Sequence, residues 1–266
     1  MTDTMSTAEA VDYEVPPVTD AERAVADLLP IAGNGHHQGH AMALASVPLW
    51  FHTFAVGDTY TPGVARDHRY RVPFLPESFE GRRVLDVGAF DGFYSFLAEA
   101  RGATRVVAVD NEQYVDWVRA RWGVELQGGE GFRAIAGLLA SKVEYVRLDA
   151  FDLADLGEDF DFVLCFGILH RVENPVGMLR IIAERLAPGG ELLLETYGVS
   201  DAEGSAGIEV RRSGDVYARD DFVYWGFTAE ALIALGENAG FASVEILDDP
   251  VIDEHPRIIA RLTATT

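Results

Sequence analysis

The residues with the clearest potential for chemistry follow short apolar stretches. One example is VLDVGAFDGFYSF, residues 84–96, in which Gly88 and Gly92 stand between a strand-like and a helix-like pattern. A glycine at such a turn lets the backbone approach a ligand closely. Turns that bind dinucleotides carry three glycines spaced as G-x-G-x-x-G, and the third is missing here. The turn therefore predicts a nucleoside-containing cofactor other than a dinucleotide.

Acidic residues around this turn indicate the charge of the ligand. Asp86 and Asp91 lie in and beside the turn, and Asp110 ends the next apolar stretch, RVVAVD. A pyrophosphate needs a helix N-terminus without negative charge nearby, so Asp86 and Asp91 fit a ligand with amino or cationic groups. Asp110 is placed to accept hydrogen bonds from both hydroxyls of a ribose. S-adenosylmethionine has a ribose, an ammonium and a sulfonium but no phosphate. We expect it as the cofactor, with S-adenosylhomocysteine as product.

Two further strand ends complete the expected cofactor site. Asp149-Ala150-Phe151 offers a hydrogen-bond acceptor beside an aromatic ring that could flank an adenine, and Phe166 ends the following apolar stretch. Ligands of open α/β sheets bind outside the carboxyl ends of the strands, where these residues would meet. The full set of expected cofactor-binding residues is Asp86, Gly88, Ala89, Asp91, Gly92, Asp110, Asn111, Asp149, Ala150, Phe151 and Phe166.

The acceptor side is indicated by a histidine and several aromatic residues. His170 follows Phe166 closely, and an imidazole titrates near neutral pH, so His170 is a candidate catalytic base or acceptor contact. The alternative is a histidine that bonds a backbone carbonyl at the strand end. The expected substrate-binding residues, for which packing is the alternative, are His52, Tyr60, Tyr197, Tyr224 and Trp225. We expect no metal site, because no cysteine or carboxylate set completes His36, His37 and His40.

From Arg82 onward, strand and helix patterns alternate. This alternation predicts an α/β fold with a mostly parallel, seven-stranded sheet that ends in an antiparallel C-terminal hairpin. Strands are expected at 82–89, 105–110, 159–170, 191–197, 243–247 and 257–264, and a further strand with the turn that follows it at 143–153. Helices are expected at 92–103, 112–123, 174–186 and 227–241, with Asn174 and Pro175 starting the third.

The N-terminal part differs in composition from the rest. Residues 1–18 predict a flexible acidic tail. Residues 19–80 predict a cap segment over the active site, beginning with a helix through Leu29 that a Thr19/Glu22 capping box starts. Residues 81–266 form the expected cofactor-binding domain.

Charge is the strongest signal in the composition. The chain has 266 residues with 43 acidic against 21 basic side chains, a net charge of −22. Nucleic-acid binding requires clustered Lys and Arg, and the pairs Arg101/Arg105 and Arg211/Arg212 are taken as ordinary solvated residues. We therefore expect a small-molecule acceptor and no nucleic-acid partner.

The cellular setting follows from three further features. A single cysteine, Cys165, permits no internal disulfide and fits a reducing compartment. No apolar run reaches the roughly 20 residues that span a bilayer, and the acidic N-terminus is unlike a signal peptide. We expect a cytoplasmic protein without a membrane partner, either a monomer or a homodimer.

Four segments in order resemble a known family. WFHTFAVGDTYTPG, VLDVGAFDGFYSF, FGILHRVENPVGML and GGELLLET resemble class I S-adenosylmethionine-dependent methyltransferases, over about residues 82–262 for the core, and within them the tRNA wobble-uridine (mo5U) methyltransferase-like branch. The resemblance implies a Rossmann-like fold and an N-terminal segment folded over the cofactor. It also implies cofactor contacts at Asp86, Gly88, Asp110, Asp149 and Ala150. Phe90 departs from the pattern, since many such enzymes have glycine there.

These observations favour transfer of a methyl group to an oxygen, or a carbon, of a small metabolite. Two alternatives remain open: a tRNA wobble-uridine methyltransferase or carboxymethyltransferase, and a non-catalytic domain that binds S-adenosylmethionine. The missing third glycine disfavours an NAD-dependent oxidoreductase.

Overall fold

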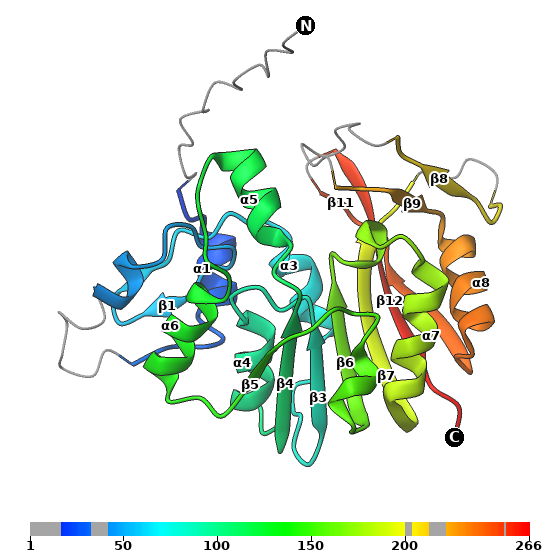
Figure 1. Cartoon of the computed structure of the whole chain (residues 1–266), viewed down its shortest axis with the longest axis horizontal. Helices are drawn as coiled ribbons and strands as arrows, with labels where there is room; N and C mark the ends of the chain where they lie inside the picture. Colours follow the sequence, from blue (N-terminus) through cyan, green and yellow to red (C-terminus); the bar gives the residue numbers. More distant parts are fainter. Residues whose placement is uncertain (1–16, 33–41, 200–203, 213–221, 253) are drawn as a thin grey trace, which may run out of the picture.

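The core of the protein is one twisted sheet with helices on both faces (Figure 1). The computed structural model describes residues 17–32, 42–199, 204–212, 222–252 and 254–266. The sheet has the strand order β10-β12-β7-β6-β3-β4-β5, and a short strand, β11, pairs with β12. The strands are β3 (Arg83–Val87), β4 (Arg105–Asp110), β5 (Glu144–Arg147), β6 (Phe160–Phe166), β7 (Leu186–Tyr197), β10 (Ser243–Asp248), β11 (Val251–Ile252) and β12 (His255–Thr263).

Pairing within the sheet confirms the predicted fold class. β3 lies between β4 and β6, and both pairs are parallel, as are β4–β5 and β6–β7. β12 runs antiparallel to both β7 and β10. The carboxyl ends of β3, β4, β5, β6 and β7 therefore lie along one edge of the sheet, where a ligand is expected.

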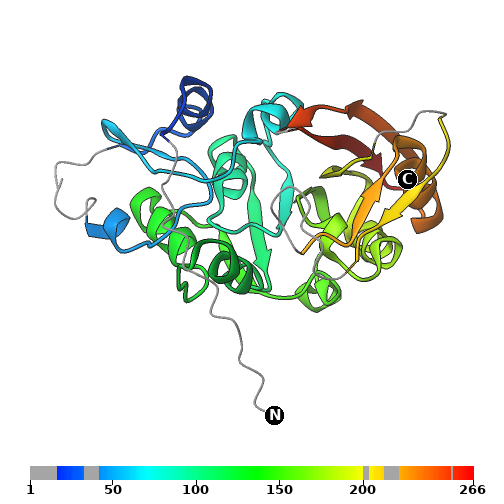
Figure 2. The same cartoon turned by 90° about the horizontal axis from the view of Figure 1, so that it is seen from above.

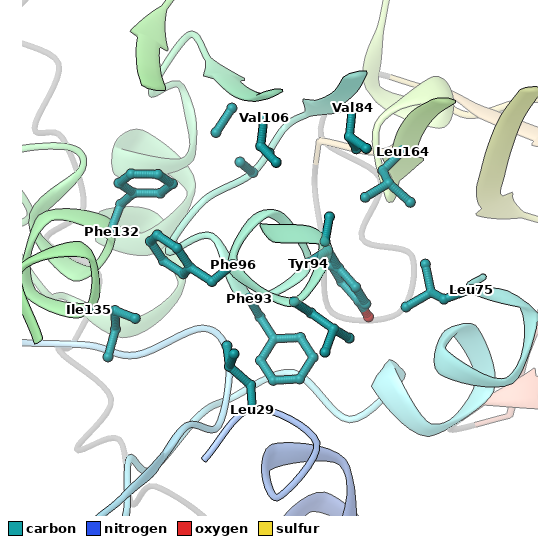
Figure 3. Close-up of a cluster of buried hydrophobic side chains, with 14 of the residues drawn as sticks. Leu29, Leu75, Val84, Phe93, Tyr94, Phe96, Val106, Phe132, Ile135 and Leu164 are labelled. Carbon is teal, nitrogen blue, oxygen red and sulfur yellow. The ribbon is translucent and has the colours of Figure 1, made fainter. Parts of the chain in front are cut away.

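Alternate residues of the central strands bury against the two helical layers. Val84, Val106 and Leu164 pack with Phe93 and Phe96 of α4 on one face (Figure 3). Their neighbours Leu85, Val107 and Val163 pack with the helices α7 and α8 on the other face. The central strands are thus apolar on both sides, as parallel strands covered by helices are. The helices are α4 (Phe93–Ala100), α5 (Tyr114–Trp122), α6 (Glu130–Leu139), α7 (Pro175–Arg185) and α8 (Ala229–Ala239).

The N-terminal segment begins with a helix (dark blue in Figure 2) that lies away from the C-terminal elements (orange to red). It contains α1 (Asp20–Ala26), β1 (Ala55–Val56), β2 (Thr59–Tyr60), α3 (His68–Arg71) and the 3-10 helix η1 (Val72–Phe74). The capping box of Thr19 and Glu22 is present. The helix ends at Ala26, three residues earlier than predicted, and Leu29 instead packs into the core.

Other elements differ from the sequence expectations. α6 was not predicted, and its buried Phe132 and Ile135 join the core. β7 begins at Leu186, five residues before the strand expected at 191–197, and its pairing with β6 shifts register near this start. Two short strands, β8 (Ile208–Val210) and β9 (Trp225–Phe227), form a separate antiparallel pair.

Several expectations concern residues or properties outside this core. Most of the predicted acidic tail, and His36, His37 and His40, lie outside the described residues. Within the described part of the chain, no group of three or more His, Cys, Asp or Glu side chains is arranged to hold a metal ion. No helix found there is long and apolar enough to cross a membrane.

Candidate active site

The glycine turn joins β3 to α4 in a conformation that needs glycine. Gly88 and Gly92 have φ of +80° and +82°, in the left-handed region that side chains rarely adopt. The amide N–H groups of Gly88 and Ala89 both donate to the Val109 carbonyl, at 2.9 and 3.2 Å. This fixes the turn against the end of β4, and so beside Asp110.

Asp110 organises the neighbouring loops through its carboxylate. One oxygen accepts from the Phe90 amide at 3.0 Å and the other from the Glu112 amide at 2.8 Å. Burial raises the pKa of Asp110 to about 6. Since each carboxylate oxygen has two lone pairs, both can still accept a further hydrogen bond. Two ribose hydroxyls are suitable donors for them.

Asn111 and Asp149 connect the ends of β4 and β5. The Asn111 amide donates to Asp149 at 2.8 Å, and the Phe151 amide donates to the other Asp149 oxygen at 2.9 Å. Both residues, with Ala150 and Phe151, are half-buried. The structure thus brings together the expected acceptor and the expected aromatic residue.

Asp86 and Asp91 are both buried but face different partners. Asp86 accepts a 2.5 Å hydrogen bond from the Ser95 hydroxyl of α4, and burial raises its pKa to about 6. Asp91 accepts from the backbone amides of Phe51 and His52, each at 2.9 Å, and from the His52 ring. Asp91 therefore joins the N-terminal segment to the glycine turn.

The residues at the turn fit S-adenosylmethionine. A Cβ at Gly88 would collide with the Ile168 side chain, which packs directly over the turn. Ile168 ends in a flexible side chain that a ligand can displace. Beside the turn stand the buried Asp110 carboxylate and the Asn111–Asp149 pair, and the hydrogen bonds that these carboxylates accept within the described part of the chain come from amide groups. These carboxylate acceptors match the hydroxyls of a ribose and an amino group, which donate hydrogen bonds.

The candidate acceptor residues form a second cluster around His170. His170 is fully buried in the 3-10 helix η3 (Leu169–Arg171). Its ring lies 4.4 Å from the Tyr197 ring, and its carbonyl accepts from the Tyr224 amide at 2.9 Å. The Trp225 indole donates to the Val172 carbonyl at 2.7 Å. The structure brings these four residues together, and their role in binding an acceptor stays a prediction.

The His170 ring has one free donor. Nδ1 accepts from the Tyr197 amide at 3.3 Å, which places the proton on Nε2, and Nε2 is buried without a hydrogen-bond partner among the described residues. Burial lowers the pKa of His170 well below its usual range, and Arg171, Arg257 and Arg71 lower it further. The geometry therefore favours a neutral donor, whereas the sequence suggested a base.

The other two substrate candidates lie in different surroundings. His52 is buried against Asp91, His68 and Phe93, at the base of the turn. Tyr60 donates instead to Asp27, which follows α1, at 2.9 Å. The structure does not bring Tyr60 together with the His170 cluster.

Two buried arginines flank one carboxylate near the end of β7. Glu195 accepts from Arg71 at 2.6 Å and from Arg257 at 2.8 Å. Arg71 also pairs with Asp67, and its guanidinium lies 5.3 Å from the Phe166 ring. The Nε atoms of both arginines are buried and donate no hydrogen bond within the described residues. Sequence reasoning missed this cluster, because its residues come from three separate segments: Asp67 and Arg71 from α3 and its start, Glu195 from β7 and Arg257 from β12.

Aromatic side chains cover the turn. Phe90, at φ +52°, stacks between Tyr114 at 3.8 Å and Phe51 at 4.6 Å between ring centroids. Trp117 of α5 lies beyond Phe51, and the Arg171 guanidinium stands over it at 5.3 Å. Trp117 and Arg171 were also missed. The only sequence signal was their place, just after the strand ends that carry Asp110 and Phe166.

A family model for a methyltransferase domain matches residues 61–246. Among solved structures, the N-terminal domain of EvdMO1 with S-adenosylhomocysteine bound superposes with a TM-score of 0.61 over 86% of this chain and 97% of that domain, at 22% identity. A Burkholderia thailandensis 1,6-didemethyltoxoflavin-N1-methyltransferase gives 0.50 over 70% of this chain and 72% of its own, at 21% identity. At these identities the likeness concerns the fold alone.

Curated relatives share one name. A tRNA U34 carboxymethyltransferase of Campylobacter hominis is 31% identical over 185 residues, covering 69% of this chain and 58% of the relative. One from Vibrio vulnificus is 29% identical over 228 residues, covering 82% of this chain and 65% of the relative. The chain thus spans about half to two thirds of the length of these relatives.

Proposed function

The chain belongs to the S-adenosylmethionine-dependent methyltransferase family, and from this premise we propose that it transfers a carboxymethyl group to the wobble uridine, U34, of tRNA. The observation that supports binding of the S-adenosylmethionine-type donor is the buried Asp110 carboxylate beside the glycine turn of Gly88. The choice of tRNA as the acceptor is supported by the name that the curated relatives share. We further propose that the protein acts in the cytoplasm.

This proposal corrects two sequence expectations. The small-molecule acceptor, and the argument against a nucleic-acid partner, were wrong: the curated relatives are named for tRNA modification. The physical error was to let the net charge of −22 outweigh a local cluster of arginines. Binding to phosphates depends on local cations. Arg147 ends β5, Arg171 follows β6, and Arg119 and Arg121 lie on α5, all at the carboxyl edge of the sheet.

The arginine pairs named in the sequence analysis, Arg101/Arg105 and Arg211/Arg212, are not part of this group at the carboxyl edge. Arg105 begins β4, at the opposite edge of the sheet, and pairs with Glu144 and Glu158. Arg101 donates to the Pro76 carbonyl at 2.7 Å. Arg211 follows β8 and pairs with Glu209 at 3.1 Å. None of these contacts supports a role for these residues in tRNA binding.

The protein's own residues would act by placement. When bound, S-adenosylmethionine, as such or carboxylated on its methyl group, supplies an electrophilic carbon on a sulfonium. Asp110, Asn111 and Asp149 would hold the nucleoside end, and the turn at Gly88 would set its depth. Positioning the uridine in line with the reactive carbon contributes most of the rate enhancement of such a transfer. The Nε2–H of His170 is available to donate to an acceptor oxygen.

Transfer of a carboxymethyl rather than a methyl group requires a cation near the transferred carbon. Arg71 and Arg257 are candidates for this cation. Arg71 is buried beside Gly167, and Arg257 is buried beside Glu195, whose carboxylate also approaches Gly167. Their net charge is offset by Asp67 and Glu195, but each retains an Nε–H without a partner among the described residues. Hydrogen bonds from a guanidinium to a carboxylate are among the strongest in proteins.

The test combines the full chain with tRNA from a strain that lacks its gene, and with S-adenosylmethionine or its carboxylated form. The tRNA is then digested, and its nucleosides are analysed by mass spectrometry. We expect carboxymethylated uridine from position 34 with the carboxylated donor. If only methylated uridine formed, tRNA would remain the acceptor, but the transferred group would be methyl and not carboxymethyl. Unmodified tRNA with both donors would overturn the proposal.

A further inference from the structure

One contact joins two loops that the strand order keeps apart. Arg171 belongs to the loop after β6, and Trp117 to the helix after β4. β3 lies between β4 and β6 in the sheet. The 5.3 Å contact between the Arg171 guanidinium and the Trp117 ring must therefore pass over the carboxyl end of β3. The glycine turn of Gly88 begins at that end.

A hydrogen bond holds the Arg171 side chain in place, and ring contacts hold Trp117. The Arg171 Nε donates to the Gly167 carbonyl at 2.9 Å, which fixes the guanidinium at the strand end. Trp117 packs edge-on against Trp122 at 4.8 Å and Phe51 at 6.1 Å between ring centroids. Neither neighbour stacks face to face with Trp117, since the interplanar angles are 82° and 69°.

The chemistry of this pair matches a nucleobase. Proteins bind extruded RNA bases by stacking them on aromatic rings and on arginine guanidinium planes. The Trp117 Nε1–H is buried and donates no hydrogen bond within the described residues, so a donor is available beside the ring. Uracil carries two carbonyl oxygens that can accept it.

We propose that Trp117 and Arg171 form the stacking site for the base that accepts the transferred group. The pyrimidine ring lies against the face of Trp117 that Arg171 covers in this structure, and the guanidinium closes on the other face of the base. This inference rests on the proposed function and names the residues that select a flat base at the turn. It places the acceptor directly above the Gly88 turn, where the donor carbon is expected.

The test compares two anticodon stem-loop RNAs, one with uridine at position 34 and one abasic there. Their affinities for the full chain are measured in the presence of S-adenosylhomocysteine, by anisotropy of a label on the stem. We expect the unsubstituted protein to prefer the uridine RNA by roughly 5- to 100-fold, the range for stacking of one base. Trp117→Leu and Arg171→Gln should reduce this preference to near one.

Arg121→Gln is the matched control. Arg121 also lies over a tryptophan, Trp122 at 4.9 Å, and its substitution removes the same charge. Its effect should be equal for both RNAs, so the preference should remain. Trp117→Phe keeps an aromatic face and should keep most of the preference. Binding of S-adenosylhomocysteine to each variant checks that the site is folded, and Arg171→Lys replaces Arg171→Gln if the latter fails this check.

The outcomes separate this inference from the proposed function. If the unsubstituted protein modifies tRNA but Trp117→Leu and the Arg171 variant both retain the preference, the stacking site is wrong and the function stands. If Arg121→Gln lowers the preference as much as Arg171→Gln does while Trp117→Leu retains it, charge rather than stacking explains the preference, and the inference is again overturned. A protein that neither modifies tRNA nor prefers the uridine RNA overturns both.

Discussion

At the scale of single residues, Asp110 shows how one side chain can hold a loop and remain available to a ligand. Its two oxygens bind two backbone amides and keep lone pairs free. Asp110→Asn replaces one acceptor oxygen by a donor. We expect cofactor affinity to fall by about 1–3 kcal/mol, the cost of a lost hydrogen bond to a charged group. Calorimetry with S-adenosylhomocysteine measures this, and an unchanged affinity would remove Asp110 from the site.

The pKa of Asp110 also predicts a pH dependence. Ribose hydroxyls donate to the ionised carboxylate, so binding favours the deprotonated form. Because the pKa of Asp110 is about 6, affinity for S-adenosylhomocysteine should be full above that pH and fall as the pH drops through it. Repeating the titration between about pH 5 and pH 8, on both sides of this pKa, tests the dependence. Asp110→Asn should flatten the dependence, apart from any part due to Asp86, whose pKa is also about 6.

His170 gives a prediction that separates a donor from a base. A buried neutral ring with a strongly lowered pKa stays uncharged across neutral pH. We therefore expect no step in kcat between pH 6 and pH 8 attributable to His170, and a reduced kcat at all these pH values in His170→Ala, roughly 10-fold or more for a lost donor. A profile whose acidic limb disappears in His170→Ala would instead establish the base role suggested by the sequence.

At the scale of elements, Asp91 connects the N-terminal segment to the glycine turn. Asp91→Asn weakens three hydrogen bonds of one buried carboxylate. We expect a loss of about 2 kcal/mol in the free energy of unfolding. We also expect faster hydrogen exchange at the Phe51 and His52 amides. Asp116→Asn, at an exposed acid of α5 that pairs with Arg119, is the control and should change stability by less than about 0.5 kcal/mol. Unchanged exchange at Phe51 would contradict the connection.

The elements also show what the sequence could and could not predict. The alternation of apolar strands and helices depends on local periodicity, which explains why the sheet and the position of Asp110 were predicted correctly. The Thr19 capping box is local in the same way. The contacts of Asp91 with His52 and of Arg71 with Glu195 join residues 39 and 124 positions apart. No local pattern encodes such pairs. α6 was missed because its glycine-rich start resembles a loop, while burial of Phe132 and Ile135 stabilises the helix.

At the scale of the whole molecule, the distribution of charge matters more than its sum. Arg147 ends β5 at the carboxyl edge and is 73% exposed, whereas Arg82 precedes β3 at the other edge and is 40% exposed. We expect Arg147→Gln to reduce the slope of log affinity for tRNA against log salt by about 1, because one phosphate contact is lost. Arg82→Gln should leave the slope unchanged. Equal effects of the two substitutions would place the tRNA surface elsewhere.

The shared carboxylate of Asp91 bears on how this protein could be recombined with its relatives. A chimera that takes residues 19–80 from one parent and the remainder from another would have its crossover between His52 and Asp91. Because the two backbone amides of residues 51 and 52 and the His52 ring all depend on that one acid, the parents must match at both positions. A crossover after residue 92 would transfer the segment, the turn and their connection as one unit.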